Sequence, residues 1–170
     1  QRIWSMRNIT ILILLIITLH SCGIYSFSGA SIPKEATTVS VDYFENKASV
    51  VQPNLSQLIT EKLKDLFSEQ TNLSVVEQSA DLAFIGEITK YNIKPISIKA
   101  NETSEKNRLT ITVNVTYSNN INSQNEFATS FSRFKDYESN QNFIEIEETL
   151  IEEITEEITE DIFNKAFVNW

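Results

Sequence analysis

The side chains best suited to nucleophilic or metal chemistry are scarce in this chain and lie at one end of it. The 170 residues include one Cys, one His and one Met, which are Cys22, His20 and Met6. If the first 21 of the 170 residues are removed, the 149 that remain contain no His and no Met, and their one Cys comes first. We therefore expect no Ser–His–Asp or Cys–His nucleophile, no His or multi-Cys metal site and no internal disulfide.

Other kinds of chemical site are also poorly supported. Gly23, Gly29 and Gly86 are the only glycines, and they cannot form a Gly-rich phosphate loop or a dinucleotide-binding fingerprint. Many acidic residues lie in 143–167, but glutamates spread along a helix diverge, whereas the ligands of a calcium site converge. Paired catalytic carboxylates need a concave site, of which the sequence gives no sign. We predict a protein that is not an enzyme and has no cofactor and no metal.

The N-terminal segment has the features of a bacterial lipoprotein signal peptide. Arg7 supplies a positive charge, and residues 9–19 are an apolar run, too short for a membrane span of roughly 20 residues. The run ends in Leu19-His20-Ser21-Cys22, which resembles a lipobox, with Leu at position −3 and a small residue at −1. The resemblance implies cleavage between Ser21 and Cys22, diacylglycerylation of the Cys22 thiol and acylation of the new amine.

This signal divides the chain. Met6 is the expected start, with residues 1–5 an over-extension, so we predict a signal peptide at 1–21, a lipidated tether at 22–36 and one domain at 37–170. Several acyl chains together hold a protein stably on a membrane. Gly23 is not the Asp associated with inner-membrane retention, and no acidic residue follows in 24–31 to resemble a surface-export signal. We therefore expect an anchor in the outer membrane, with the domain on the periplasmic side.

The charge of the domain excludes one class of partner. Removing residues 1–21 takes away Arg2 and Arg7 but none of the 23 acidic residues, which changes the net charge from −9 to −11. An acidic domain of this kind does not attract nucleic acid or anionic lipid head groups by its bulk charge. We expect no nucleic-acid partner.

Hydrophobic periodicity predicts an α+β domain in the order strand, helix, strands, helix. Pro53 is expected at the first position of the first helix, and Pro95 at a strand end or a sheet edge. The apolar parity of the second strand changes near Lys90, which predicts a bulge. We expect strands at 37–44, 82–93, 109–117 and 127–137, a short apolar run at 73–76, and helices at about 53–69 and 143–167. Each helix has one apolar stripe, so we predict a small, antiparallel-rich mixed sheet of about four strands with both helices on one face.

Three segments resemble the LptE family of lipopolysaccharide-assembly lipoproteins in its Bacteroidetes form. They are residues 22–33 (CGIYSFSGASIP), 107–115 (NRLTITVNV) and 161–170 (DIFNKAFVNW), and the likeness spans residues 22–170. The resemblance implies a small sheet backed by two helices and no catalysis. It also implies a partnership with the LptD β-barrel, whose assembly such proteins help, and a role in inserting lipopolysaccharide into the outer leaflet.

With this resemblance in view, two groups of residues are candidates for contact with a ligand or partner. Seven cations fall on the later predicted strands and the loop between them, where we expect them to gather at one end of the sheet: Lys90, Lys94, Lys99, Lys106, Arg108, Arg133 and Lys135. They are suited to bind the phosphates of lipopolysaccharide through charge-assisted hydrogen bonds. The alternative is a solvated strand end that balances the acidic last helix.

The second candidate is an uncharged polar strand face. Thr110, Thr112, Asn114 and Thr116 alternate with apolar residues over 109–117. Such a face suits a polar barrel lumen, since neutral groups can be buried there without stranding a charge, but a water-facing sheet rich in Thr fits equally well. The alternative function is a periplasmic lipoprotein that binds a small apolar ligand or lipid between helices and sheet.

Overall fold

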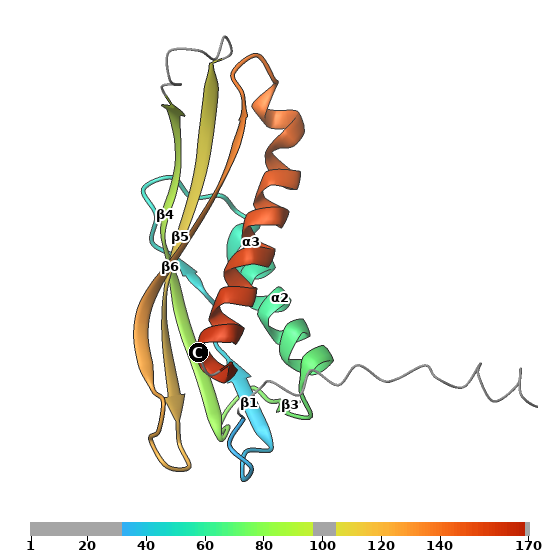
Figure 1. The fold of residues 1–170 in the computed structure, drawn as a ribbon, viewed down its shortest axis with the longest axis vertical. Coiled ribbons are helices and arrows are strands. Elements are labelled where there is room, and N and C mark those ends of the chain that lie inside the picture. Colours follow the sequence, from blue (N-terminus) through green and yellow to red (C-terminus); the bar gives the residue numbers. More distant parts are fainter. Residues whose placement is uncertain (1–31, 97–104, 169–170) are drawn as a thin grey trace, which may run out of the picture.

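The fold is described from a computed structural model, which places residues 32–96 and 105–168. These residues form two helices and a six-stranded mixed sheet. In chain order the elements are β1 (Thr38–Val41), β2 (Glu45–Asn46), α2 (Leu55–Gln70), β3 (Ser74–Val75), β4 (Leu82–Ile96), β5 (Lys106–Asn119), β6 (Phe127–Glu138) and α3 (Phe143–Phe167). Both helices lie on the same side of the sheet (Figure 1), which confirms the predicted α+β architecture.

The sheet joins two kinds of pairing. The strands run in the order β3-β1-β4-β5-β6, and the short β2 also pairs with β4. The pairs β1–β3, β1–β4 and β2–β4 are parallel, whereas β4, β5 and β6 form an antiparallel meander. The expected count of about four strands is therefore too low. The additional strands β2 and β3 have two residues each, too short to show a period.

The bulge predicted in the second long strand is confirmed. The register of β4 against β5 shifts between Ile88 and Lys90. Before the shift, Leu82, Phe84 and Ile88 are buried; after it, the buried residue is Tyr91. One extra residue in β4 therefore reverses which parity of the strand points to the helices.

Several predicted boundaries need correction. β1 ends at Val41, so Tyr43 is 59% exposed and Phe44 is buried in its place. α2 begins at Leu55 after Asn54 as its N-cap residue, and Pro53 lies outside the helix. β4 passes through Pro95 and ends at Ile96; no strand pairs with its other edge there among the described residues, which is why a residue without an N–H is tolerated. The last helix has the predicted limits.

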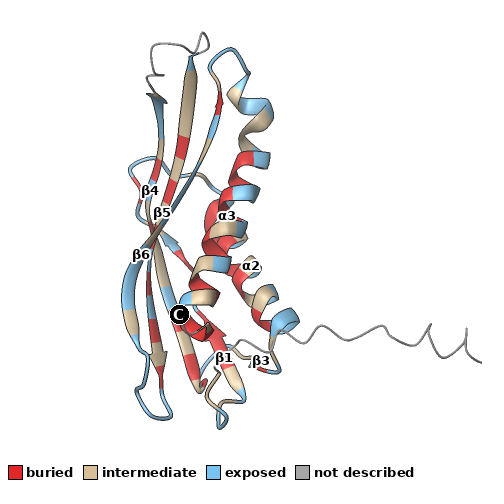
Figure 2. Cartoon of the chain, in the orientation of Figure 1, coloured by how far each residue is buried: buried red, intermediate tan, exposed pale blue. Residues whose placement is uncertain are grey.

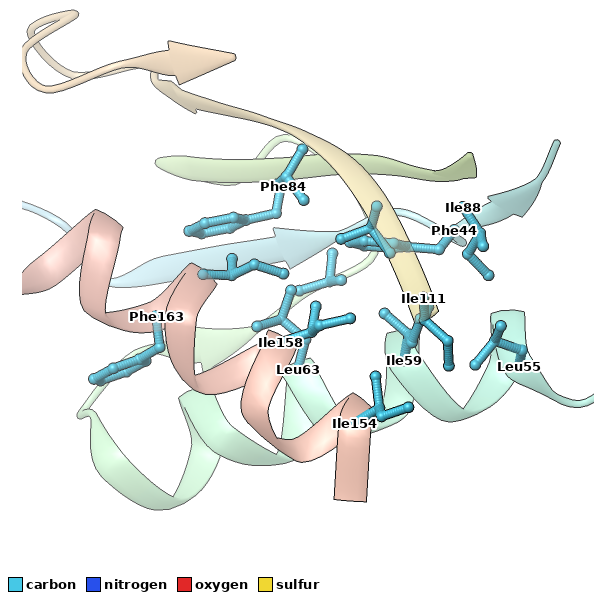
Figure 3. Close-up of a cluster of buried hydrophobic side chains, with 14 of the residues drawn as sticks. Phe44, Leu55, Ile59, Leu63, Phe84, Ile88, Ile111, Ile154, Ile158 and Phe163 are labelled. Atoms are coloured by element: carbon cyan, nitrogen blue, oxygen red, sulfur yellow. The ribbon is translucent and has the colours of Figure 1, made fainter. Parts of the chain in front are cut away.

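The core lies between the helices and one face of the sheet. We call this face the inner face; Leu109, Ile111, Val113 and Val115 of β5 point into it and are at most 1% exposed. Figure 2 shows the buried residues of α2 and α3 turned toward the sheet and toward each other, and Figure 3 shows Ile59, Leu63, Ile154 and Ile158 from the two helices meeting in this core. Neither of the two described helices lies on the opposite face of β4, β5 and β6, which we call the outer face.

Candidate functional site

The outer face carries a ladder of short, uncharged polar side chains in the middle of β5. Thr110, Thr112, Asn114 and Thr116 all point to it, because the residues between them fill the core. Thr112 lies opposite Ser132 of β6, and their hydroxyl oxygens are 2.9 Å apart. The structure thus assigns the four predicted residues to one face, uncovered by the two helices.

Cations follow this ladder toward the distal end of β4 and the start of β5. Lys90 lies opposite Thr112, and Lys94 lies opposite Arg108 in the same sheet register. Since directly opposed residues share a face, Lys90, Lys94, Lys106 and Arg108 all belong to the outer face. We call these four residues the basic strip. The bulge after Ile88 is what turns Lys90 and Lys94 outward, because without it their parity would face the core.

Arg108 is held in place within the basic strip. Its Nε and one terminal nitrogen donate to the two carboxylate oxygens of Asp136 at 2.7 and 2.8 Å, and its guanidinium carbon lies 3.6 Å from the centre of the Phe134 ring. The hydrogen bond from Arg108 keeps the pKa of the Asp136 carboxyl below its usual value. Nζ of Lys106 lies 3.5 Å from Oε1 of Glu138, with which it forms an ion pair. Lys90 and Lys94 are exposed and form no ion pair within the described residues.

Of the seven predicted cations, the remaining two that the structure describes lie on the inner face. Arg133 donates to both carboxylate oxygens of Asp161 at 2.6 Å, and Lys135 reaches Glu157 at 2.8 Å and Glu153 at 3.2 Å. These pairs fasten β6 to the acidic side of α3. The pKa of Arg133 and that of Lys135 are raised, in each case chiefly by hydrogen bonds to these carboxylates.

The predicted cation cluster is therefore divided between two faces. Alternation along β6 indicates this division, because Arg133 and Lys135 share their parity with Phe127 and Phe131, which pack against the core. Phe134 makes the alternation harder to recognise, since it is apolar but points outward and is 47% exposed. Lys99, like Ser21 and Cys22, lies outside the described residues.

A groove that the sequence did not reveal lies at the other end of the polar ladder. It has a volume of about 760 Å³. One wall consists of Asp42 and Tyr43, between β1 and β2, and of Glu45 at the start of β2. Its floor consists of residues from three adjacent strands: Ile85, Gly86 and Glu87 of β4, Asn114, Val115 and Thr116 of β5, and Ala128, Thr129 and Ser130 of β6. We call it the sheet groove.

A smaller cleft of about 350 Å³ lies between the start of α2 and the first half of α3. Leu58, Ile144 and Ile151 line it together with Glu147, Glu148 and Glu152, so it is partly acidic. In the described part of the chain, no three or more His, Cys, Asp or Glu residues are grouped as a metal site would need, and no helix there is long and apolar enough to cross a membrane.

Comparison with known proteins identifies the family and the fold. The model of the family LptE, described as lipopolysaccharide-assembly, matches residues 36–166. A minor lipoprotein from Acinetobacter baumannii is similar in structure, with a TM-score of 0.51 and 10% identity over 76% of this chain and 91% of that one. A hypothetical protein from Chlamydia trachomatis gives a TM-score of 0.52 at 8% identity, over 77% and 98% of the two chains. No curated protein sequence matches the chain.

Proposed function

Because this chain belongs to the LptE family of lipopolysaccharide-assembly proteins, we propose that it works as a non-enzymatic outer-membrane lipoprotein that helps an LptD-like β-barrel to assemble and to insert lipopolysaccharide into the outer leaflet. The observation that carries this proposal is the family match over residues 36–166. The uncovered polar ladder supports the partnership with a barrel, since a polar lumen can meet its hydroxyl and amide groups without burying an unpaired charge.

The partnership is tested by crosslinking in membranes. A photoreactive residue is placed at Thr112 or Thr116 of the ladder, with Glu152 and Glu156 on the exposed side of α3 as matched control positions. We expect the two ladder positions to crosslink to a large outer-membrane barrel protein and the control positions not to do so. Recovery of the protein alone in mild detergent, or crosslinks from α3 only, would contradict the proposal.

We propose the basic strip as the place where the phosphates of lipopolysaccharide are bound. Lys90 and Lys94 are exposed on one face with Arg108, and no ion pair with a described residue neutralises these two lysines. Arg133 and Lys135 are left out of this proposal, since carboxylates of α3 already occupy them.

The two sets of cations provide a matched test. A Lys90→Gln/Lys94→Gln variant is expected to weaken lipopolysaccharide binding by roughly tenfold or more, because hydrogen bonds to charged groups contribute roughly 1.5–3 kcal/mol each. A control Arg133→Gln/Lys135→Gln variant removes the same charge from the inner face and is expected to bind normally. Equal losses in the two variants would mean that only the overall charge matters.

The membrane anchor is proposed to be the acylated N-terminus that the lipobox-like segment implies. Cys22 would carry the lipid, and the outer membrane would be the site of attachment. A Cys22→Ala protein is expected to remain unacylated and to leave the membrane fraction when the barrel partner is absent. Membrane retention of that variant without acylation would overturn the lipidation of Cys22.

A further inference from the structure

The sheet groove differs from the basic strip in its charge. Three carboxylates line it, from Asp42, Glu45 and Glu87, and no Lys or Arg is among the described residues that line it. Lys47 forms an ion pair with Glu45 at its edge, and the Asn114 amide donates to Glu87 at 3.3 Å. A phosphate or another anion would meet repulsion here, so the groove is not an extension of the basic strip.

The floor of the groove offers paired donors and acceptors that carry no charge. Thr116 and Ser130 present hydroxyls from two adjacent strands, and both residues are exposed, as is Asn114. Each hydroxyl both donates and accepts a hydrogen bond, whereas the carboxylates only accept. This set of groups matches a ligand with many hydroxyls, each of which can donate to a carboxylate and accept from a Thr or Ser.

Two exposed apolar side chains complete the site. Tyr43 is 59% exposed in the wall of the groove and Ile85 is 54% exposed in its floor. An aromatic ring beside convergent polar groups gives a ligand an apolar surface to pack on while its polar edges are bound. Saccharides combine both properties, because a pyranose ring has an apolar C–H face and a rim of hydroxyls.

We propose that the sheet groove binds a short, neutral saccharide. The volume of about 760 Å³ lies in the range of roughly 300–1,000 Å³ usual for small-molecule sites. Tyr43 packs against a sugar ring, Glu87 and Asp42 accept from sugar hydroxyls, and Thr116 and Ser130 donate to them. This site goes beyond the proposed function and does not depend on the basic strip or on a barrel partner.

The test compares three trisaccharides of different charge. The full-length lipoprotein is kept in a detergent without sugar head groups, and binding is measured by saturation-transfer NMR and calorimetry. The probes are neutral chitotriose, its cationic deacetylated form and anionic trigalacturonate. We expect chitotriose to bind and trigalacturonate not to bind. The proposal is overturned if no neutral saccharide binds, if the anion binds as well, or if only the cationic form binds.

Variants locate the binding site. Tyr43→Ala and Thr116→Val are expected to weaken chitotriose binding at least fivefold. Phe134→Ala is the matched control, because Phe134 is an exposed aromatic residue on the same face but outside the groove. Binding that persists in the first two variants, or that is lost in the control, would overturn the assignment. The Lys90→Gln/Lys94→Gln variant is expected to bind chitotriose normally, which separates this result from the test of lipopolysaccharide binding.

A last comparison distinguishes two sources of such a saccharide. The neutral sugars of a lipopolysaccharide, freed of lipid and phosphate, are compared with chitotriose as a model of a free glycan. Stronger binding of the former, sensitive to Tyr43→Ala, would identify lipopolysaccharide as the source. Stronger binding of chitotriose, with the same sensitivity, would identify a free glycan, and both results support the site.

Discussion

Asp81 and Thr38 hydrogen-bond to each other in both directions. Oδ2 of Asp81 accepts from the backbone N–H of Thr38 at 3.0 Å and from its hydroxyl at 2.9 Å, and the Thr38 hydroxyl in turn accepts from the Asp81 N–H at 2.9 Å. Thr37 adds two more bonds to the same oxygen, at 2.8 and 3.0 Å. Asp81, the residue before β4, is therefore hydrogen-bonded to the start of β1, where the parallel part of the sheet begins.

This arrangement predicts a pH-dependent contribution to stability. Hydrogen bonds from Thr37 and Thr38 lower the pKa of Asp81. Its stabilising effect is therefore fully present above the unfolded-state pKa of about 4 and is lost as the pH falls through the lower folded-state value. We expect Asp81→Asn to lower the thermal midpoint at pH 7, with a difference from wild type that shrinks toward pH 2.

Thermal denaturation of both proteins at several pH values measures this effect. Asp65→Asn, an exposed acid on α2, is the matched control and is expected to change little. A difference between Asp81→Asn and wild type that is the same at pH 7 and pH 2 would show that the charge of Asp81 does not matter.

The fold could be predicted from the sequence where a pattern is long and continuous. The apolar stripe of α3 repeats over 25 residues, so its limits were predicted correctly, and the alternation in 109–117 identified the centre of β5. The reversal of parity near Lys90 has a direct meaning, since a strand that keeps its buried face must insert a residue. By contrast, β2 and β3 are too short to have a pattern of their own and are defined by pairing with the edges of β4 and β1, respectively.

The candidate site was predictable only in part, for a related reason. Thr110, Thr112, Asn114 and Thr116 belong to one strand, and alternation alone puts them on one face. The sheet groove needs Tyr43, Gly86 and Ser130 to meet from three distant segments, which depends on strand order and not on local pattern. The charge partners of Arg133 likewise depend on where α3 crosses β6.

A glycine in β4 makes room for a buried ring, which predicts a strong steric effect. A Cβ at Gly86 would lie 2.2 Å from Cε1 of Phe44, and Phe44 is fully buried, with its N–H donating to Thr60 at 3.1 Å. The ring cannot move away without disturbing the core. We expect Gly86→Ala to lower the free energy of unfolding by about 1–3 kcal/mol, measured by denaturant titration.

A double-mutant cycle checks that Phe44 is the cause. In a Phe44→Ala background the obstructing ring is gone, so adding Gly86→Ala is expected to cost little or to stabilise slightly, because Ala is less flexible than Gly in the unfolded chain. The same loss from Gly86→Ala in both backgrounds would place the steric conflict elsewhere.

The burial of Tyr117 leads us to expect a loss of stability at alkaline pH. Its side chain is 2% exposed and stacks on Phe84 with ring centres 4.8 Å apart. Burial, with a smaller contribution from Glu126, raises the pKa of Tyr117 to about 12. The unfolded chain loses this proton near pH 10, so the stability that comes from keeping Tyr117 neutral is full below about pH 10 and falls as the pH rises toward 12.

Replacing the phenol removes this effect. Tyr117→Phe keeps the ring, and we expect its free energy of unfolding to decline less than that of wild type between pH 10 and 12. Denaturant titrations at pH 8, 10 and 11 measure the difference. The exposed Tyr43→Phe is the control and is expected to follow wild type. Parallel declines in Tyr117→Phe and wild type would contradict the prediction.

A Thr→Val substitution is expected to change the free energy of unfolding in opposite directions at two buried threonines. Thr155 in α3 is fully buried, and its hydroxyl has no hydrogen-bond partner within the described residues. The hydroxyl of Thr60 in α2 is also buried but is fully used, since it donates to the Ser56 carbonyl at 2.7 Å and accepts from the Phe44 N–H at 3.1 Å. Val has nearly the shape of Thr and a similar helix propensity, so the substitution isolates the hydroxyl.

We expect Thr155→Val to raise the free energy of unfolding by about 1 kcal/mol, because a buried hydroxyl without a partner has lost its hydrogen bonds to water and no bond within the protein replaces them. Thr60→Val is expected to lower it by about 1–3 kcal/mol, because the Phe44 N–H is left without an acceptor in the core. Denaturant titrations of both variants beside wild type measure the two changes. A loss of stability in Thr155→Val would mean that its hydroxyl does form a hydrogen bond in solution, and an unchanged Thr60→Val would mean that water reaches the Phe44 N–H.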